Sequence, residues 1–398
     1  MHDRGMRGRS SGAHAHASLP NSYTRGKSLV GVGMVLCIVV LFSLNSQVMA
    51  GLTARKGHGE PRVSPFLIIW LCHACLGAFL PAHAAYTVCY RQQLSGGAWL
   101  RQLRGLLGPR TAAATLGLSA VYMLQNWAFV KALEFSSVTV DTAIYQCVSI
   151  WVFLLSVAWL GESAEPRKVA AVAMSVAGVL LISASEVGSG GGGGAGGAGG
   201  AAGGLRQNEL AGAGLALLST LAGAGYQVVF KGYCGALSTG GVFLFLGLMG
   251  LAHLAVLWLF MPLLHVTGVE RFVWPSARQW GVLELTSLVA LCVNTLCMFT
   301  IHICSPLFHS VGMALTVPAS YLCDLALGNI DALRLPTLGG VLLDTAGFVL
   351  LSLSGSGQRS GTAADGIALR QVPYAAVATS DAHSDDDEGR DSDRDSTQ

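Results

Sequence analysis

Long apolar runs alternate with short polar connectors along most of the chain. The runs are about twenty residues long, which is the length a helix needs to cross a hydrocarbon core about 30 Å thick. They lack the period-two alternation of barrel strands and are too long for them. The pattern therefore predicts ten transmembrane helices, over 28–50, 65–90, 111–133, 137–160, 167–185, 209–230, 241–264, 279–301, 306–328 and 336–354.

Composition agrees with this pattern, because 52% of the residues are hydrophobic and only 12% are charged. The charges gather in the connectors and at the two ends. We expect residues 1–27 to form a disordered basic N-terminus and residues 355–398 a disordered acidic tail. The cysteines lie in or beside apolar runs, so neither a disulfide framework nor a metal site is expected. The chain is therefore predicted to be an all-α polytopic membrane protein.

The segment 188–204 is dense in glycine and divides the spans into two sets of five. Glycine at this density without a collagen period buries little apolar surface, so we expect a linker loop over 186–208. The first set then occupies 28–185 and the second 209–354. With an even total of spans, both termini lie on one side, which carries more Lys and Arg, including Arg101 and Arg104. This excess predicts cytosolic termini.

The two sets resemble each other. A shift of 169 positions places Ser136 on Ser305 and Gly178 on Gly347, and aligns AVAMSVAGVLLISAS with GVLLDTAGFVLLSLS. Earlier in the sets, His73 aligns with His253 at a shift of 180. Each repeat has an odd number of spans, so the second must insert upside down relative to the first. Such inverted repeats are typical of secondary transporters, whose substrate site lies near the membrane midplane.

Two stretches carry a family resemblance. LQNWAFVKALEFSSVTVDTAIYQCVSIWVFLLSVAWLGE resembles the EamA-like drug/metabolite transporter superfamily, in which an ALxxxS segment leads into the fourth helix and a GE pair closes it. SPLFHSVGMALTVPASYLCDLAL resembles the F-type members of solute carrier family 35, the nucleotide-sugar-transporter-like carriers. The resemblance implies ten helices, cytosolic termini, a central cavity and an internal membrane. The second half departs from it, having Gly328 and Asn329 near the place of Gly161 and Glu162.

Polar residues follow helical faces within several predicted spans. A carboxylate at the centre of a membrane helix costs about 2.5–3.5 kcal/mol on insertion scales, so it should face protein or water. Pro318 removes a helical hydrogen bond, and a kink at this depth is tolerated where it lines a cavity. The predicted cavity lining is Tyr122, Gln125, Asn126, Asp141, Tyr145, Ser149, Glu284, Ser287, Asn294, Thr316, Pro318 and Ser320.

Structural interpretations compete with these. Polar stripes also hold membrane helices together through hydrogen bonds worth about 0.6–2 kcal/mol each. Asp324 fits a cap near the end of a span, and Asp344 fits either a dimer contact or the cavity. Lys131 and Lys231 near span ends fit interfacial anchors. Six histidines in or beside the predicted spans are compatible with proton relay or with simple packing, namely His73, His83, His253, His265, His302 and His309.

The function predicted from these features is secondary transport of a small organic solute across an internal membrane by alternating access. The charged candidates include more deep carboxylates than deep bases, which favours a cationic or neutral substrate, and the resemblance suggests a thiamine-like cation. A nucleotide-sugar antiporter and a non-transporting scaffold or sensor remain open alternatives. We expect no enzyme activity, cofactor, metal or nucleic-acid partner. The expected partners are the substrate, the lipid bilayer and a second copy in a homodimer.

Asp141→Asn tests the predicted charge contact. The change removes a charge with little change in volume, so folding should survive. For a cationic substrate, a lost charged hydrogen bond worth about 1.5–3 kcal/mol should weaken binding by roughly ten- to a hundredfold. Substrate affinity in reconstituted vesicles measures the effect, with Glu165→Gln as the control. If Asp141→Asn is expressed normally and binds substrate with unchanged affinity, Asp141 has a structural role and not a role in binding.

Overall fold

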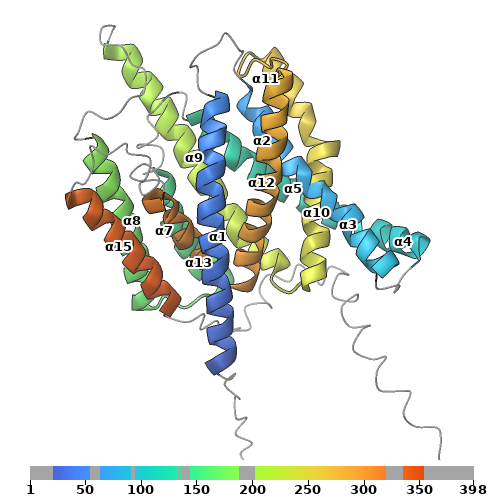
Figure 1. Cartoon of the computed structure of the whole chain (residues 1–398), viewed down its shortest axis with the longest axis horizontal. Helices are drawn as coiled ribbons and strands as arrows, with labels where there is room; N and C mark the ends of the chain where they lie inside the picture. Colours follow the sequence, from blue (N-terminus) through green and yellow to red (C-terminus); the bar gives the residue numbers. More distant parts are fainter. Residues whose placement is uncertain are drawn as a thin grey trace, which may run out of the picture.

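In the computed structural model, all regular secondary structure is helical within the described residues, namely 21–53, 63–90, 95–132, 135, 144–187, 202–319 and 335–353 (Figure 1). The main helices of the first half are α1 (Asn21–Thr53), α2 (Pro65–Ala74), α3 (Phe79–Ala85), α4 (Gly96–Leu106), α5 (Pro109–Ala132), α7 (Val148–Leu160) and α8 (Pro166–Val187). Those of the second are α9 (Ala202–Cys234), α10 (Thr239–Ala255), α11 (Phe260–Val266), α12 (Ala277–Ile303), α13 (Pro306–Ala314) and α15 (Leu335–Leu353). The predicted all-helical class is confirmed over these ranges.

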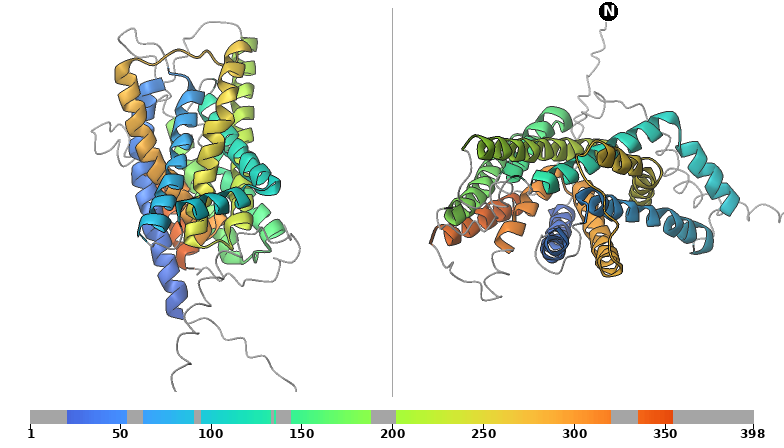
Figure 2. Two further views of the ribbon diagram at one scale, coloured as in Figure 1. Left: turned by 90° about the vertical axis from the view of Figure 1, so that its right-hand side faces the viewer. Right: turned by 90° about the horizontal axis from the view of Figure 1, so that it is seen from above.

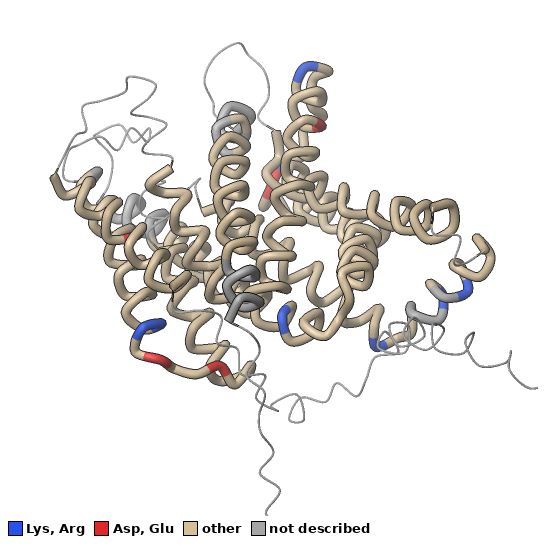
Figure 3. The backbone as a smooth tube through the Cα atoms, turned by 60° about the horizontal axis from the view of Figure 1, so that its bottom comes forward, with Lys and Arg blue, Asp and Glu red and all other residues tan. Residues whose placement is uncertain are grey.

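Several of these segments are long and apolar enough to cross a bilayer. Among the described residues, six helices qualify by length and composition, and two shorter apolar helices cover Leu29–Asn45 and Ile144–Leu160. Charged residues are sparse along the helices and stand mainly near their ends (Figure 3). A multi-pass membrane protein is thus confirmed, whereas the count of ten transmembrane helices stays a prediction. The six are Pro65–Tyr90, Pro166–Ser185, Leu210–Cys234, Thr239–Val266, Ala277–Ile303 and Leu335–Leu353.

Some predicted boundaries shift. Helix α9 begins at Ala202, inside the range expected for the linker, so the glycine-rich segment between α8 and α9 is shorter than predicted. Most of that segment, the first 20 residues and the tail from 354 onward lie outside the described residues. Gly161 ends α7 in a left-handed conformation with φ of 65°, which only glycine adopts without strain.

Two spans that the repeat aligns are interrupted in the same way. In the second span a 3-10 turn, Cys75–Ala78, separates α2 from α3, and in the seventh a 3-10 turn, Leu257–Leu259, separates α10 from α11. Each turn contains the residue four positions before a proline, Pro81 or Pro262. Proline has no N–H to offer that residue's carbonyl, so the α-helical ladder is broken there. The interruptions follow directly from the two prolines.

The helices pack largely in antiparallel pairs. Helix α1 lies against α12, α5 against α9, and α8 against α15 (Figures 1 and 2). The α8–α15 contacts run in opposite directions, because Ser185 meets Thr337 with 2.6 Å between the hydroxyl oxygens, while Ser175 meets Asp344 further along. Gly31, near the start of α1, packs against Cys304 at the end of α12. The start of α1 and the α12–α13 junction therefore share one end of the bundle.

Glycine allows α10 to approach the interrupted second span closely. A Cβ added at Gly250 would overlap the backbone nitrogen of Gly77 in the 3-10 turn, and one at Gly247 would lie 2.9 Å from Leu80 Cγ. Because backbone atoms stand at the Gly77 contact, a side-chain rotation cannot relieve the overlap there. Small residues at such crossings allow the backbones of membrane helices to meet.

Gly250→Ala should therefore destabilise the protein. Overpacking of a fitted contact costs about 1–3 kcal/mol, and here the backbone itself must move. The matched control is Gly225→Ala in α9, where an added Cβ meets nothing within 4 Å. Thermal unfolding in detergent should show a lower midpoint for Gly250→Ala and an unchanged or slightly higher midpoint for Gly225→Ala. Equal midpoints would contradict the close contact.

Candidate functional site

A column of stacked rings crosses the interior between the two halves. The His73 ring on α2 stacks on Tyr122 of α5 with 4.3 Å between centroids, and Tyr122 stacks on Tyr226 of α9 at 4.5 Å. The His253 ring on α10 meets the His73 ring edge-on at 5.0 Å. All four side chains are buried. The arrangement brings together the two histidines that the sequence repeat aligns.

Hydrogen bonds link this column to α12. The Tyr122 hydroxyl donates to Asn294 Oδ1 at 2.7 Å, and the Tyr226 hydroxyl donates to Met298 Sδ at 2.9 Å. On the other side of Tyr122, Gln125 Nε2 donates to the Tyr145 hydroxyl at 3.0 Å. We call His73, Tyr122, Gln125, Tyr145, Tyr226, His253, Asn294 and Met298 the central cluster. It draws on helices of both halves, namely α2, α5, α9, α10 and α12.

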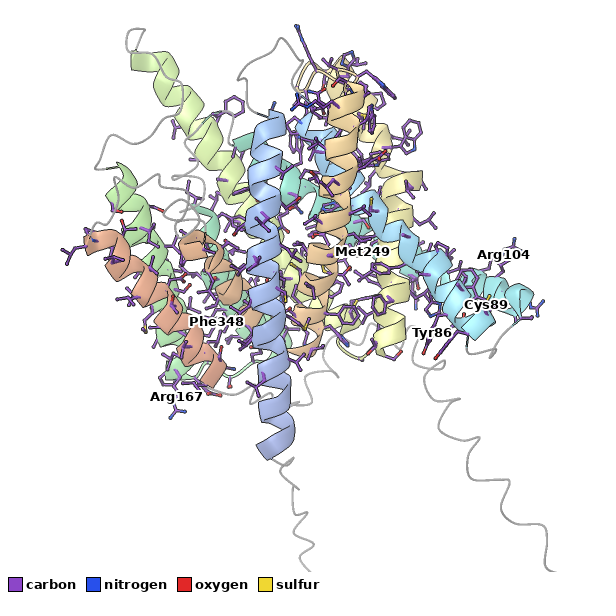
Figure 4. The ribbon with its side chains drawn as sticks, in the orientation of Figure 1. Tyr86, Cys89, Arg104, Arg167, Met249 and Phe348 are labelled. Atoms are coloured by element: carbon purple, nitrogen blue, oxygen red, sulfur yellow. The ribbon has the colours of Figure 1, made fainter. Side chains whose placement is uncertain are left out.

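Several polar atoms in or beside the central cluster have no hydrogen-bond partner in the protein. They are His73 Nδ1, Gln125 Oε1, His253 Nε2 and, on α7, Ser149 Oγ. His253 Nδ1 already pairs with the Met249 carbonyl oxygen at 2.8 Å, so Nε2 is the ring nitrogen left over. Met249 itself lies near the centre of the bundle in Figure 4. Buried polar atoms usually have a hydrogen-bond partner, so these four atoms leave hydrogen-bonding capacity within the interior.

The predicted lining residues divide into distinct groups. Tyr122, Gln125, Tyr145 and Asn294 come together in the central cluster, with Ser149 buried on α7. Ser287 is buried next to Cys72 but donates to the Leu283 carbonyl of its own helix at 2.7 Å. Two more donate to carbonyls within their own helical segments, Asn126 to Tyr122 at 2.9 Å and Thr316 to Met313 at 2.7 Å.

Glu284 lies apart from this group. Although it follows the same sequence stripe as Ser287 and Asn294, its side chain is exposed. Pro318 is buried, and α13 ends at Ala314, the residue whose carbonyl loses its helical donor because of that proline. Three further candidates, Asp141, Ser320 and Asp324, lie outside the described residues.

The secondary candidates take part in helix packing. Lys131 Nζ donates to the Val269 carbonyl at 3.1 Å, and Lys231 Nζ donates to the His302 and Cys304 carbonyls at 2.6 and 3.2 Å. A lysine at the end of α12 complements the negative end of the helix dipole. Asp344 is fully buried between α15 and α8, where Ser175 Oγ donates to Asp344 Oδ1 at 2.5 Å.

Sequence reasoning missed the stacking partner Tyr226 and left His73 and His253 open between relay and packing. The repeat alignment was the available signal for the histidines, since it places His73 and His253 at equivalent positions. Tyr226 carries no comparable signal, because it lies among small and apolar residues of α9. Among the described residues, no group of three or more His, Cys, Asp or Glu side chains could hold a metal ion.

The fold and the buried cluster define a multi-pass membrane protein with a polar, aromatic interior. No family model matches the chain. The chain is 24% identical to human solute carrier family 35 member F3 over 303 residues, which cover 74% of this chain and 66% of that protein. It is 28% identical to an uncharacterized transporter of Schizosaccharomyces pombe over 244 residues, 61% of this chain and 69% of that protein. The match to Bos taurus solute carrier family 35 member F5 is 22% identical and covers 58% of this chain and 42% of that protein.

The chain thus spans about two thirds or less of the length of these relatives. A solved crystal structure aligns with 82% of this chain and 97% of its own at a TM-score of 0.52 and 17% identity, which shows a shared fold alone. The chain is similar to F-type members of solute carrier family 35, and the resemblance read from its sequence is confirmed.

The glutamate of the GE pair lies outside the membrane-spanning helices, at the end of the bundle where α12 meets α13. Glu162 Oε2 is 3.9 Å from Lys168 Nζ, and Glu162 Oε1 is buried without a hydrogen-bond partner. Burial raises the pKa of the Glu162 carboxyl, and the positive charges of Lys168 and Lys231 oppose that shift without cancelling it. The charged form of this side chain is therefore disfavoured in the folded protein.

Glu162→Gln should change how stability depends on pH. A raised folded-state pKa means that folding stability is lost as pH rises through that value, because the buried carboxyl must then ionise. Glutamine does not ionise, so the difference in unfolding temperature between Glu162→Gln and wild type should increase with pH. At pH values below the range in which the carboxyl titrates, this difference should be constant. A difference that stays constant between pH 4 and 8, or grows on acidification, would contradict the assignment.

Proposed function

We propose that the protein is a secondary transporter that moves a small organic solute across an internal membrane by alternating access. The observation that carries this proposal is the central cluster, where buried polar atoms without partners lie among stacked rings contributed by both halves. Polar groups in a bilayer interior are costly, so a fold that needed only stability would place apolar side chains there. The names of the relatives, solute carriers and a transporter, support the same class.

Contacts between α8 and α15 support the proposed inverted repeats. A Cβ at Gly178 would lie 2.6 Å from Gly340 O and 2.6 Å from Asp344 N. The residue 169 positions later, Gly347, makes the matching contacts, since a Cβ there would lie 2.8 Å from Ala171 O and 2.9 Å from Ser175 N. The same shift places Ala171 on Gly340 and Ser175 on Asp344, so each contact has its counterpart. Such reciprocity is expected of two antiparallel helices related by a pseudo-two-fold axis in the membrane plane.

The chemistry of the central cluster favours a neutral or cationic solute. Its described members are rings, amides and a thioether, which offer ring faces and lone pairs but no fixed positive charge. Phosphate recognition calls for Arg or Lys, and the two lysines near the span ends, Lys131 and Lys231, already donate to backbone carbonyls. These features support a thiamine-like or other small organic substrate over a nucleotide sugar.

Tyr122→Phe tests the central cluster as the substrate site. The change removes the hydroxyl that donates to Asn294 but keeps the stacked ring. If that hydroxyl or the amide it orients contacts substrate, a lost hydrogen bond of about 0.5–1.5 kcal/mol should weaken affinity by roughly two- to tenfold. The substrate would first be found by a thermal-shift screen of purified protein against vitamins, amines and nucleotide sugars. Uptake into proteoliposomes then gives affinity and rate.

The control is Tyr90→Phe, the same chemical change at a side chain that is 80% exposed. It should leave uptake unchanged. Unaltered affinity in Tyr122→Phe, or the absence of uptake for every compound that stabilises the protein, would count against transport through this cluster.

A further inference from the structure

Glu270 is a buried carboxylate that joins the two halves at one end of the bundle. It lies in the connection between α11 and α12 and is only 7% exposed. It accepts hydrogen bonds from Ser64 Oγ, from the Phe66 backbone N–H at 2.8 Å, and from Trp127 Nε1 at 2.9 Å. Ser64 and Phe66 begin α2 and Trp127 lies on α5, so every donor belongs to the first half and the acceptor to the second.

A second bond reinforces the same connection. Lys131 Nζ, one turn beyond Trp127 on α5, donates to the carbonyl of Val269, which directly precedes Glu270. The start of α2 and the end of α5 are thus both fastened to one short segment of the second half. Hydrogen bonds to a charged acceptor are roughly twice as strong as those between neutral groups. We call this group of contacts the Glu270 latch.

The Glu270 latch lies between the central cluster and the end of the bundle opposite the start of α1. Ser64 follows the end of α1 along the chain, whereas the start of α1 packs beside Cys304 at the other end of the bundle. Seven residues separate Phe66 from His73 on α2, which corresponds to about 10 Å at 1.5 Å per helical residue. Trp127 lies about 7 Å beyond Tyr122 on α5 by the same measure. Along both α2 and α5, the latch therefore lies between the central cluster and this end of the bundle.

We propose that Glu270 is the gating residue that keeps the central cluster closed toward the side opposite the termini. The proposal rests on the proposed transport function, because alternating access requires the halves to separate at this end. Separation breaks the bonds to Ser64, Phe66 and Trp127, and water that enters then hydrates the freed carboxylate. A carboxylate suits a reversible gate for that reason, since its donors are replaced by water in the open state instead of being lost.

Native cysteines provide a test that needs no substrate. Cys72 on α2 and Cys297 on α12 are 3% and 8% exposed, and both lie beside the central cluster. In sealed vesicles of known protein orientation, a membrane-impermeant maleimide is added on the side opposite the termini or on the termini side. Peptide mass spectrometry then gives the modification rate of each cysteine. Glu270→Gln keeps the shape but removes the charge, and we expect about tenfold faster labelling from the side opposite the termini.

Trp127→Phe removes the indole donor and keeps an aromatic ring, so it should act in the same direction. If both residues act through one contact, their effects should not add. The increase in labelling rate of the double variant, expressed as a free energy, should then be smaller than the sum of the two single-variant effects. Glu165→Gln, the same charge change in the loop between α7 and α8 at the other end, is the matched control and should label as wild type does.

Sidedness separates gating from stability. Unchanged labelling in Glu270→Gln, or an equal rise from both sides as a loosened fold would give, overturns the proposal. The result is also independent of transport itself. One-sided acceleration with no uptake of any solute would preserve the gate and reject the transporter, whereas normal uptake with unchanged labelling would preserve the transporter and reject the gate.

Discussion

The scarcity of water in the bilayer interior is the constraint on which the structure depends. A polar side chain there must bond to its own helix, to a neighbouring helix, or to whatever occupies the interior. Some take the first course, as when Ser287 and Thr316 donate to carbonyls a turn earlier. Others bridge helices, as Tyr122 and Asn294 do. Of the described atoms that do neither, His73 Nδ1, Gln125 Oε1 and His253 Nε2 belong to the central cluster, and others are distributed along the remaining helices.

The same constraint explains what the sequence could predict. Apolar length and the scarcity of charge suffice to identify helices that cross a membrane, because the bilayer fixes the length of each. Helical spacing also placed Tyr122, Gln125 and Asn294 correctly on inward faces. Glu284 shows where spacing fails, since it continues the stripe of Ser287 and Asn294 and yet is exposed. A stripe drifts around a straight helix over several turns, so residues at its ends leave the face that its middle occupies.

The contribution of loop residues was harder to foresee. A glutamate in a polar connector is usually solvated, and nothing local in the sequence around Glu270 distinguishes it from such a residue. Its burial arises from tertiary structure, because the α11–α12 connection folds over the start of α2 and the end of α5. Interactions between segments 143 and 204 positions apart have no periodic signature. The histidine pair was more accessible, since a repeat converts distant positions into expected neighbours.

The interrupted helices have a mechanical consequence. Bending an intact helix requires its hydrogen bonds to stretch, but at Pro81 and Pro262 one bond of the ladder is already missing. Between these two weak points, Gly77 and Gly250 bring backbone against backbone, which fixes the point of contact while leaving the arms on either side free to tilt. The second and seventh spans can thus pivot about the contact between Gly77 and Gly250. A tilt that brings the two spans together at one end of the bundle then moves them apart at the other end.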